Sequence, residues 1–203
     1  ESSAGDWHLA GLRVINTLIG GLLALLGARL LWPTDEWNRL PEFSAETIRA
    51  DAAFLRNAAR VAHDANPHAL GTLRDDRRAI ALSAANAEDS FQRLLSDHAG
   101  PSETLEPIMA VLVYSRRVAT ATATLALAGE PNAAEPEVDR FVTLLEPVLN
   151  DLADAVATGR APAPFPPEPT PAEPRMRRIA RQVRLLHDAV DRWMTSDAVP
   201  RRR

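Results

Sequence analysis

Three polar side chains, Arg13, Asn16 and Thr17, stand where a long apolar stretch of the sequence begins. Residues three and four positions apart lie on the same side of a helix, so these groups share one helical face. Polar groups inside an apolar helix are typical of substrate or ion pathways, because they contact other helices rather than lipid. The chemistry that these residues predict is the binding and transport of a polar solute.

The other residue types that could do chemistry form no recognisable site. The sequence has no cysteine, no glycine-rich phosphate loop after a strand, and no Ser, His and acid set in a known motif. Its five histidines are scattered, and the pair in "HDANPH", His63 and His68, lacks a carboxylate at ligand spacing. We therefore expect no enzyme activity, no metal and no cofactor.

The apolar stretch has the properties of a membrane-spanning helix. Between Val14 and Leu31 there are eighteen residues whose only charge is Arg29, close to the roughly twenty residues that a bilayer span requires. Trp7 and Trp32 lie twenty-five positions apart, or about 37 Å along a helix. This separation suits aromatic anchors at the two membrane interfaces, and Arg29 is near enough to the end to reach the headgroups.

The faces of this predicted helix differ in a way that suits lipid. Gly20, Ala24 and Gly27 fall with Arg13 and Asn16 within about 80° of the helical circumference, and large apolar residues occupy the rest. In a membrane, small residues let helices approach closely and polar residues find partners inside the protein. The stripe therefore predicts packing against other transmembrane helices. The alternative is a buried helix of a soluble bundle.

The flanking charges predict the orientation of the span. Glu1 and Asp6 precede it, whereas four arginines follow it at positions 39, 49, 56 and 60. By the positive-inside rule, the residues after Pro33 lie in the cytoplasm.

The rest of the chain favours an all-α fold. The composition is 46% hydrophobic but only 5% aromatic, and helical periodicity prevails throughout. Ser44 and Thr72 mark predicted helix starts, Ser44 as an N-cap and Thr72 as part of a capping box. The predicted helices cover residues 7–32, 44–65, 72–97, 102–128, 136–158 and 175–196. We expect four of them, from 44 to 158, to form an antiparallel bundle that the last completes.

Composition divides the sequence into four parts. Residues 1–33 form the transmembrane helix, 34–160 the cytoplasmic bundle, 161–174 a proline-rich linker with seven prolines, and 175–203 a basic amphipathic helix and tail. Residues 34–174 carry a net charge of -10 and residues 175–203 a net charge of +6.

The basic helix therefore predicts contact with an anionic surface, either the acidic body of the protein or lipid. No motif for reading nucleic acid accompanies it. The arginines concerned are Arg175, Arg177, Arg178, Arg181 and Arg184.

Three sequence stretches resemble the C-terminal end of the FUSC family, the fusaric acid resistance and aromatic acid exporter proteins. They are "LRVINTLIGGLLALLGARLLWP", "RRAIALSAANAEDSFQRLL" and "LEPIMAVLVYSRRVATATATLAL". Family members often carry an Arg, two residues, then Asp-Thr, with a Gly three residues after the Thr. Arg13, Thr17 and Gly20 match this pattern, but Asn16 stands in the acidic place. An aspartate at this place in relatives can carry a proton, whereas Asn16 cannot.

The resemblance implies an exporter of small, often aromatic, organic acids in the bacterial inner membrane. Its partners would be other transmembrane helices of the same transporter, the lipid bilayer, further copies in a homo-oligomer and a periplasmic adaptor protein. The bundle would serve regulation, assembly or oligomerisation. The alternative from another class is a soluble helical-bundle interaction module without transport activity.

Overall fold

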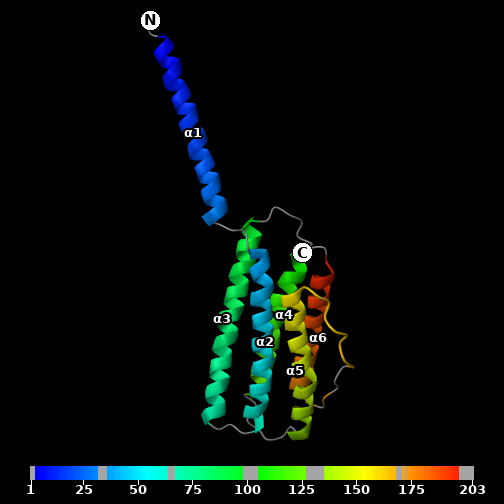
Figure 1. Ribbon diagram of the computed structural model, residues 1–203. Coiled ribbons are helices and arrows are strands. Elements are labelled where there is room, and N and C mark those ends of the chain that lie inside the picture. The colour runs from blue at the N-terminus through cyan, green and yellow to red at the C-terminus, as the bar shows by residue number, and fades with distance from the viewer. Residues whose placement is uncertain are drawn as a thin grey trace. The chain divides into compact units, whose positions relative to one another are not determined.

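The computed structural model describes residues 3–31, 36–63, 67–97, 105–126, 135–167, 171 and 173–196. These residues form helices and no strand, which confirms the all-α prediction (Figure 1). The helices are α1 (Ser3–Leu31), α2 (Glu36–His63), α3 (Pro67–Asp97), α4 (Glu106–Ala126), α5 (Glu135–Thr158) and α6 (Pro174–Thr195).

The chain divides into two compact units. The first is Glu1–Asp35 and contains α1, and the second is Glu36–Arg203 and contains α2 to α6. The second unit thus includes the proline-rich segment and the basic helix, which the sequence treats as separate parts. Among the residues described, no helix combines the length and the hydropathy that a membrane crossing requires.

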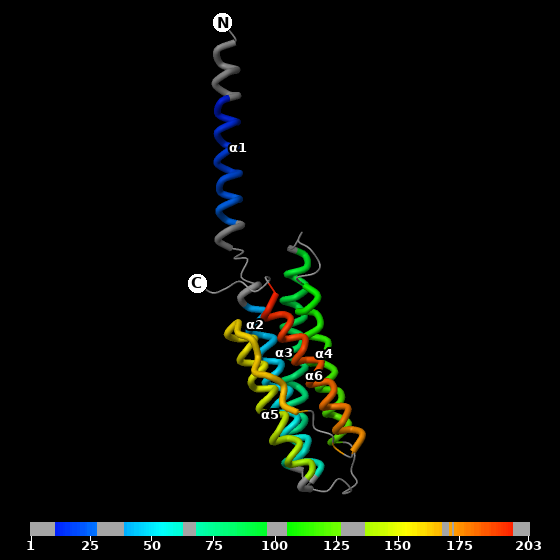
Figure 2. Tube along the Cα trace, turned by 90° about the vertical axis from the view of Figure 1, so that its right-hand side faces the viewer, coloured from blue at the N-terminus to red at the C-terminus, as the bar shows by residue number. Residues whose placement is uncertain are grey.

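The second unit is a four-helix bundle with one additional helix. α2 packs against α4 and α5, and α6 packs against α4 and α5, so these four surround one core (Figure 2). α3 lies outside this ring, against α2 along its length and against α4 at only a few points. Phe91 and Leu94 are the side chains of α3 that join the main core cluster.

The last helix completes the bundle, as predicted, since α6 packs against α4 and α5. The difference from the predicted arrangement lies in α3, which the sequence predicts to be one of the four central helices. α6 occupies a core position because its buried residues recur every three or four positions along one face. They are Met176, Ile179, Ala180, Val183, Leu186, Ala189, Val190 and Trp193. Since α3 buries fewer large side chains in the main cluster, α3 is the peripheral helix.

The predicted starts of two helices are wrong. α2 begins at Glu36, so Ser44 lies inside the helix, where its hydroxyl is buried and has no hydrogen-bond partner. The burial of Leu40, which is 1% exposed, favours helix on the N-terminal side of Ser44. α3 begins at Pro67, a residue suited to a first helical turn. Thr72 Oγ1 bonds instead to the carbonyl oxygen of His68, 3.2 Å away, within the helix.

The proline-rich segment lets α5 and α6 run in the same direction. In Figure 1 both helices rise from the lower end of the bundle, and the chain between them returns along its side. Fourteen residues in polyproline conformation reach about 43 Å, enough to pass the 22-residue α6, which is about 33 Å long. α5 ends at Thr158, and the next residue, Gly159, has a φ of 69°, which suits glycine.

Candidate functional sites on α1 and beside α3

The polar residues predicted to line a transport path lie together on α1. Arg13, Asn16 and Thr17 are all exposed, and Thr17 Oγ1 donates a hydrogen bond to the carbonyl oxygen of Arg13 at 2.9 Å. This bond satisfies the hydroxyl within the helix itself. The side chains of Arg13 and Asn16 remain available for a partner or a solute.

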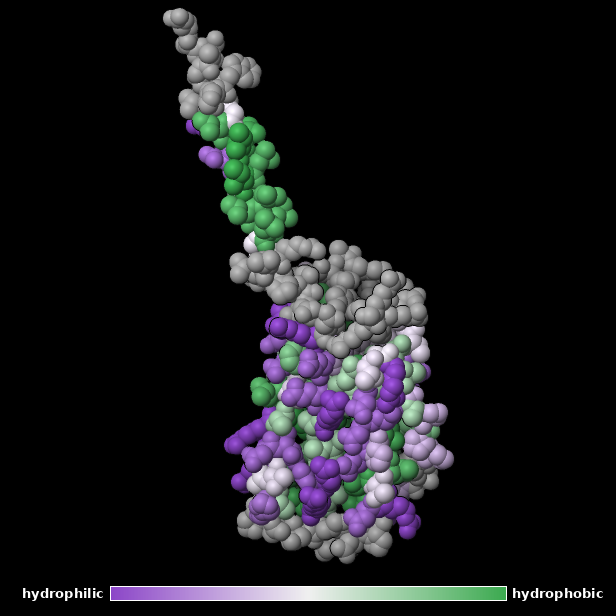
Figure 3. Space-filling view, viewed as in Figure 1, coloured by the Kyte–Doolittle hydropathy of each residue, from purple (hydrophilic) through white to green (hydrophobic). Residues whose placement is uncertain are grey.

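The large apolar side chains around this polar group are also exposed. Figure 3 shows the described part of α1 as an almost continuous hydrophobic surface, whereas hydrophilic residues predominate on the visible face of the bundle. Nine such side chains are between 47% and 71% exposed. They are Leu12, Val14, Ile15, Leu18, Ile19, Leu22, Leu23, Leu25 and Leu26. An apolar surface of this extent marks an interface with protein or lipid.

The small residues of the predicted packing stripe face open space. A Cβ atom placed on Gly20 or on Gly27 would have no neighbouring atom within 4 Å, and Ala24 is exposed. The room for a close helix neighbour is therefore present. The predicted interface anchors, the side chains of Trp7, Arg29 and Trp32, lie outside the described residues.

Arginine side chains of α6 contact the segment that directly precedes this helix in the sequence. Arg175 pairs with Glu173 at 3.4 Å, and Arg177 donates to the carbonyl oxygen of Pro171 at 3.0 Å. The guanidinium of Arg184 lies 5.7 Å from the ring centre of Phe165. Arg178 and Arg181 are exposed on the same helix. Three of the five thus contact the proline-rich segment or its end.

The first half of the proline-rich segment is bound to α5 and α6. The contacts, which we call the clasp, are made by Asp151, Arg160, Ala163, Phe165 and His187. Asp151 of α5 accepts hydrogen bonds from Arg160 at 2.5 Å and from the Ala163 amide at 2.7 Å. His187 Nε2 of α6 lies 2.8 Å from the carbonyl oxygen of Ala163. The ring of Phe165 meets the His187 ring edge-on, with centroids 5.3 Å apart. The segment is thereby joined to both parallel helices.

Replacing Asp151 should loosen this clasp. Partial burial opposes ionisation of Asp151, but hydrogen bonds from Arg160 and Ala163 and the nearby positive charges outweigh it and lower the pKa. Asp151→Ala should cost roughly 2 kcal/mol at pH 7, since charge-assisted hydrogen bonds are lost. The unfolding free energy from urea titration measures this loss.

The lowered pKa sets the pH dependence of that loss. The contribution of Asp151 is present above the ordinary pKa of 3.8 and disappears as pH falls through the lower pKa of the folded state. The control is Asp154→Ala on the same helix, which removes an exposed ion pair with Arg49 and should cost less than about 1 kcal/mol. An equal loss in both variants would contradict the clasp.

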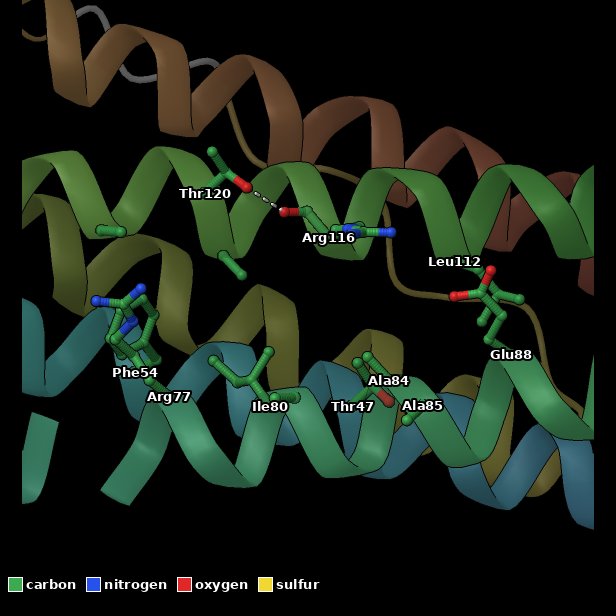
Figure 4. Close-up of a pocket in the computed structure, with 13 residues that line it drawn as sticks. Thr47, Phe54, Arg77, Ile80, Ala84, Ala85, Glu88, Leu112, Arg116 and Thr120 are labelled. Carbon is green, nitrogen blue, oxygen red and sulfur yellow. Dashed lines mark hydrogen bonds between the residues drawn. The ribbon is translucent and has the colours of Figure 1, made fainter. Parts of the chain in front are cut away.

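A groove lies between α3 and α4, with α2 as its floor. Its volume is about 490 Å³, within the range of small-molecule pockets. Figure 4 shows Phe54 and Arg77 near one end, Glu88 and Leu112 near the other, and Arg116 on the opposite wall. The groove is lined by Thr47, Phe54, Arg77, Ile80, Ala81, Ala84, Ala85, Glu88, Leu112, Arg116, Ala119, Thr120 and Ala123.

One carboxyl group is fully buried between α2 and α4. Asp51 is 0% exposed and accepts a hydrogen bond from the hydroxyl of Ser115, while its Oδ1 atom has no partner. Burial raises the pKa of Asp51 to about 8, although the bond from Ser115 opposes the rise. The group is therefore mostly protonated at neutral pH.

Sequence reasoning missed Asp51 and the groove. Asp51 lies between Ile48 and Leu55 on the apolar stripe of α2, a position that signals burial of a polar residue. Ser115 stands in the same way on the buried face of α4. Their pairing, like the groove, depends on which helices are neighbours, and helical periodicity within one segment does not contain that information.

The structure thus defines an all-helical protein with an apolar helix and a separate five-helix bundle. No family model, curated protein or solved structure matches the chain.

Proposed function

We propose that α1 is the last transmembrane helix of a bacterial inner-membrane exporter of small aromatic acids, and that α2 to α6 form its cytoplasmic bundle. The observation that carries this proposal is the exposure of nine large apolar side chains on α1. In water each such side chain leaves about 1.5 to 3 kcal/mol of burial free energy unused. Lipid would remove this cost for the whole helix.

The bundle does not need α1 to complete its own core. The main cluster of buried residues runs from Leu40 to Trp193 and includes none of the described side chains of α1. An apolar helix with nine exposed large side chains is suited to an anchor or to packing with other membrane helices. The two units therefore have different environments in the proposed arrangement.

The polar residues of α1 support a role beyond anchoring. Arg13 and Asn16 are expensive to expose to lipid, so they would face neighbouring helices of the transporter. Thr17 is less demanding because its hydroxyl is already bonded to the Arg13 carbonyl. In this arrangement Arg13 attracts a carboxylate solute, and Asn16 hydrogen-bonds it without carrying a proton.

Membrane attachment is tested by washing membranes with alkaline carbonate after expression of the full chain in bacteria. The wild-type chain should stay in the membrane fraction, and Leu18→Arg combined with Leu22→Arg should shift most of it to the supernatant, because each central arginine costs about 2.5 to 3.5 kcal/mol. The control, Thr143→Arg with Asn150→Arg, adds the same charge to exposed positions of α5. A wild-type chain that purifies without detergent as a single monodisperse species would favour the soluble interaction module.

Export is tested separately in cells that carry the whole transporter. Arg13→Ala should raise the retention of an aromatic carboxylate about tenfold, if one charge-assisted contact of about 1.4 kcal/mol is lost. Asn16→Ala should have a smaller effect because a neutral hydrogen bond is weaker. Equal retention in wild-type and Arg13→Ala cells would remove Arg13 from the transport path.

A further inference from the structure

The exposed large apolar side chains of the bundle are confined to two neighbouring helices. Among the described residues of α2 to α6, those with substantial exposure all lie on α3 or α4. They are Leu82 at 65%, Met109 at 52%, Val113 at 40%, Leu95 at 39% and Leu70 at 37%. α2, α5 and α6 contribute none of them. The α3–α4 face is defined by the groove between the helices together with Leu70, Leu95, Met109 and Val113; Leu82 lies on another side of α3.

The groove in this face is lined by small side chains. Ala81, Ala84 and Ala85 line it from α3, and Ala119 and Ala123 line it from α4. Alanine allows a helix from another molecule to approach more closely than leucine would. The face thus combines large apolar groups at its edges with a shallow centre.

Two unpaired charges lie on this face of α3. Arg77 and Glu88 both line the groove, and neither forms an ion pair within the described part of the chain. They are eleven residues apart, about three helical turns or 16 Å. At this distance the two side chains cannot pair with each other within one helix. Each could pair instead with an opposite charge on a second helix.

The groove-lining face of α3 is complementary to itself when the helix is reversed. If two α3 helices run antiparallel about a two-fold axis between positions 82 and 83, Arg77 lies opposite Glu88 of the second copy. The same axis places Ala81 opposite Ala84 of that copy and Leu70 opposite its Leu95. One operation therefore matches opposite charges, small residues and exposed leucines, as an isologous interface requires.

We propose that the α3–α4 face is the interface of a homodimer in which the two α3 helices run antiparallel. The occupant of the face is a second copy of this chain, because one two-fold axis brings Arg77 opposite Glu88 and matches the small and apolar residues of the same face. Arg77 of each copy pairs with Glu88 of the other, and Leu70 and Leu95 of this face lose their exposure. This inference does not depend on whether α1 enters a membrane.

Cysteine cross-linking tests the position of the axis, since the chain contains no native cysteine. Ala84→Cys in the full-length protein, in detergent or in membranes, should give a covalent dimer with a short bismaleimide at low protein concentration. Thr143→Cys, an exposed position on α5, is the matched control and should remain monomeric. Equal cross-linking at the two positions, or none at either, would overturn the proposal.

Charge exchange tests the pairing itself. Arg77→Glu and Glu88→Arg should each weaken dimerisation by about tenfold or more, because each places like charges opposite one another twice. The double variant exchanges both charges and should restore dimerisation to near the wild-type value. Sedimentation of the full chain, with circular dichroism to verify folding, measures both effects. A double variant that is no better than the single variants would show that these residues do not meet across a two-fold axis.

Discussion

Asp51→Asn should stabilise the bundle by on the order of 4 kcal/mol at pH 7. The wild-type carboxyl is 0% exposed, and burial raises its pKa to about 8. At pH 7 the folded protein must therefore hold a proton that the unfolded chain would release. Asparagine has nearly the same shape and carries no charge, so it avoids this cost.

The pH dependence of the wild-type protein follows from the same shift. Between pH 3.8 and about 8 the folded state keeps the proton of Asp51 and the unfolded state loses it. Because the unfolded state then binds fewer protons, stability falls as pH rises, by roughly 1.4 kcal/mol per pH unit. Below this window both states are protonated, and above it both are ionised.

Urea unfolding from pH 5 to pH 9 measures this dependence. The gain of Asp51→Asn over wild type should be about 1.5 kcal/mol at pH 5, rise steadily with pH and level off above about pH 8. Asp75→Asn, at a carboxylate that is 75% exposed, is the control and should show little difference at any pH. A constant difference between Asp51→Asn and wild type across this range would show that Asp51 does not titrate as proposed.

Ser115→Ala provides a second examination of this buried pair. The hydroxyl of Ser115 donates to Asp51 and is the interaction that lowers its pKa. Without it the ionised form loses its partner, so the pKa of Asp51 should rise further. The decline in stability should then extend to higher pH than in the wild-type protein.

The helical regions could be predicted from sequence because periodicity is a local property. The apolar residues of α6, from Ile179 to Trp193, recur every three or four positions, and the structure buries them. The predicted end of the helix 136–158 is equally local, since the φ of 69° at the next residue, Gly159, favours glycine. These features are encoded within one turn or one helix of the sequence.

The starts of α2 and α3 could not be found by the same reasoning. Ser44 and Thr72 have side chains that suit a helix cap, but such side chains also occur inside helices. Thr72 bonds to the carbonyl of His68 in that way. The packing of Leu40 in the core, which depends on other helices, supports the earlier start of α2.

The candidate sites also differ in whether local sequence could predict them. The polar and apolar faces of α1 are local and were predicted, and the side chains described there are exposed as a group. The groove and Asp51 arise from the position of α3 outside the four-helix ring and from the contact of α2 with α4. No periodicity in one segment specifies which helix becomes peripheral.

Leu186→Ala should destabilise the bundle by about 3 to 5 kcal/mol without releasing the chain from membranes. Leu186 is 0% exposed in the core formed by α6, so truncation leaves a cavity. Leu185→Ala in the same helix, at a partly exposed position, is the matched control and should cost about 1 kcal/mol.

Comparing Leu186→Ala with the substitutions in α1 tests whether the two units are stable independently. Leu18→Arg with Leu22→Arg should abolish membrane attachment while the unfolding midpoint of the bundle stays within about 2 °C of wild type. Leu186→Ala should do the reverse, because the core of the bundle contains no described side chain of α1. Limited proteolysis and carbonate extraction of the same samples measure both properties. If either variant changed both properties together, the bundle and α1 would depend on each other for stability, and the separation of anchor and bundle would be wrong.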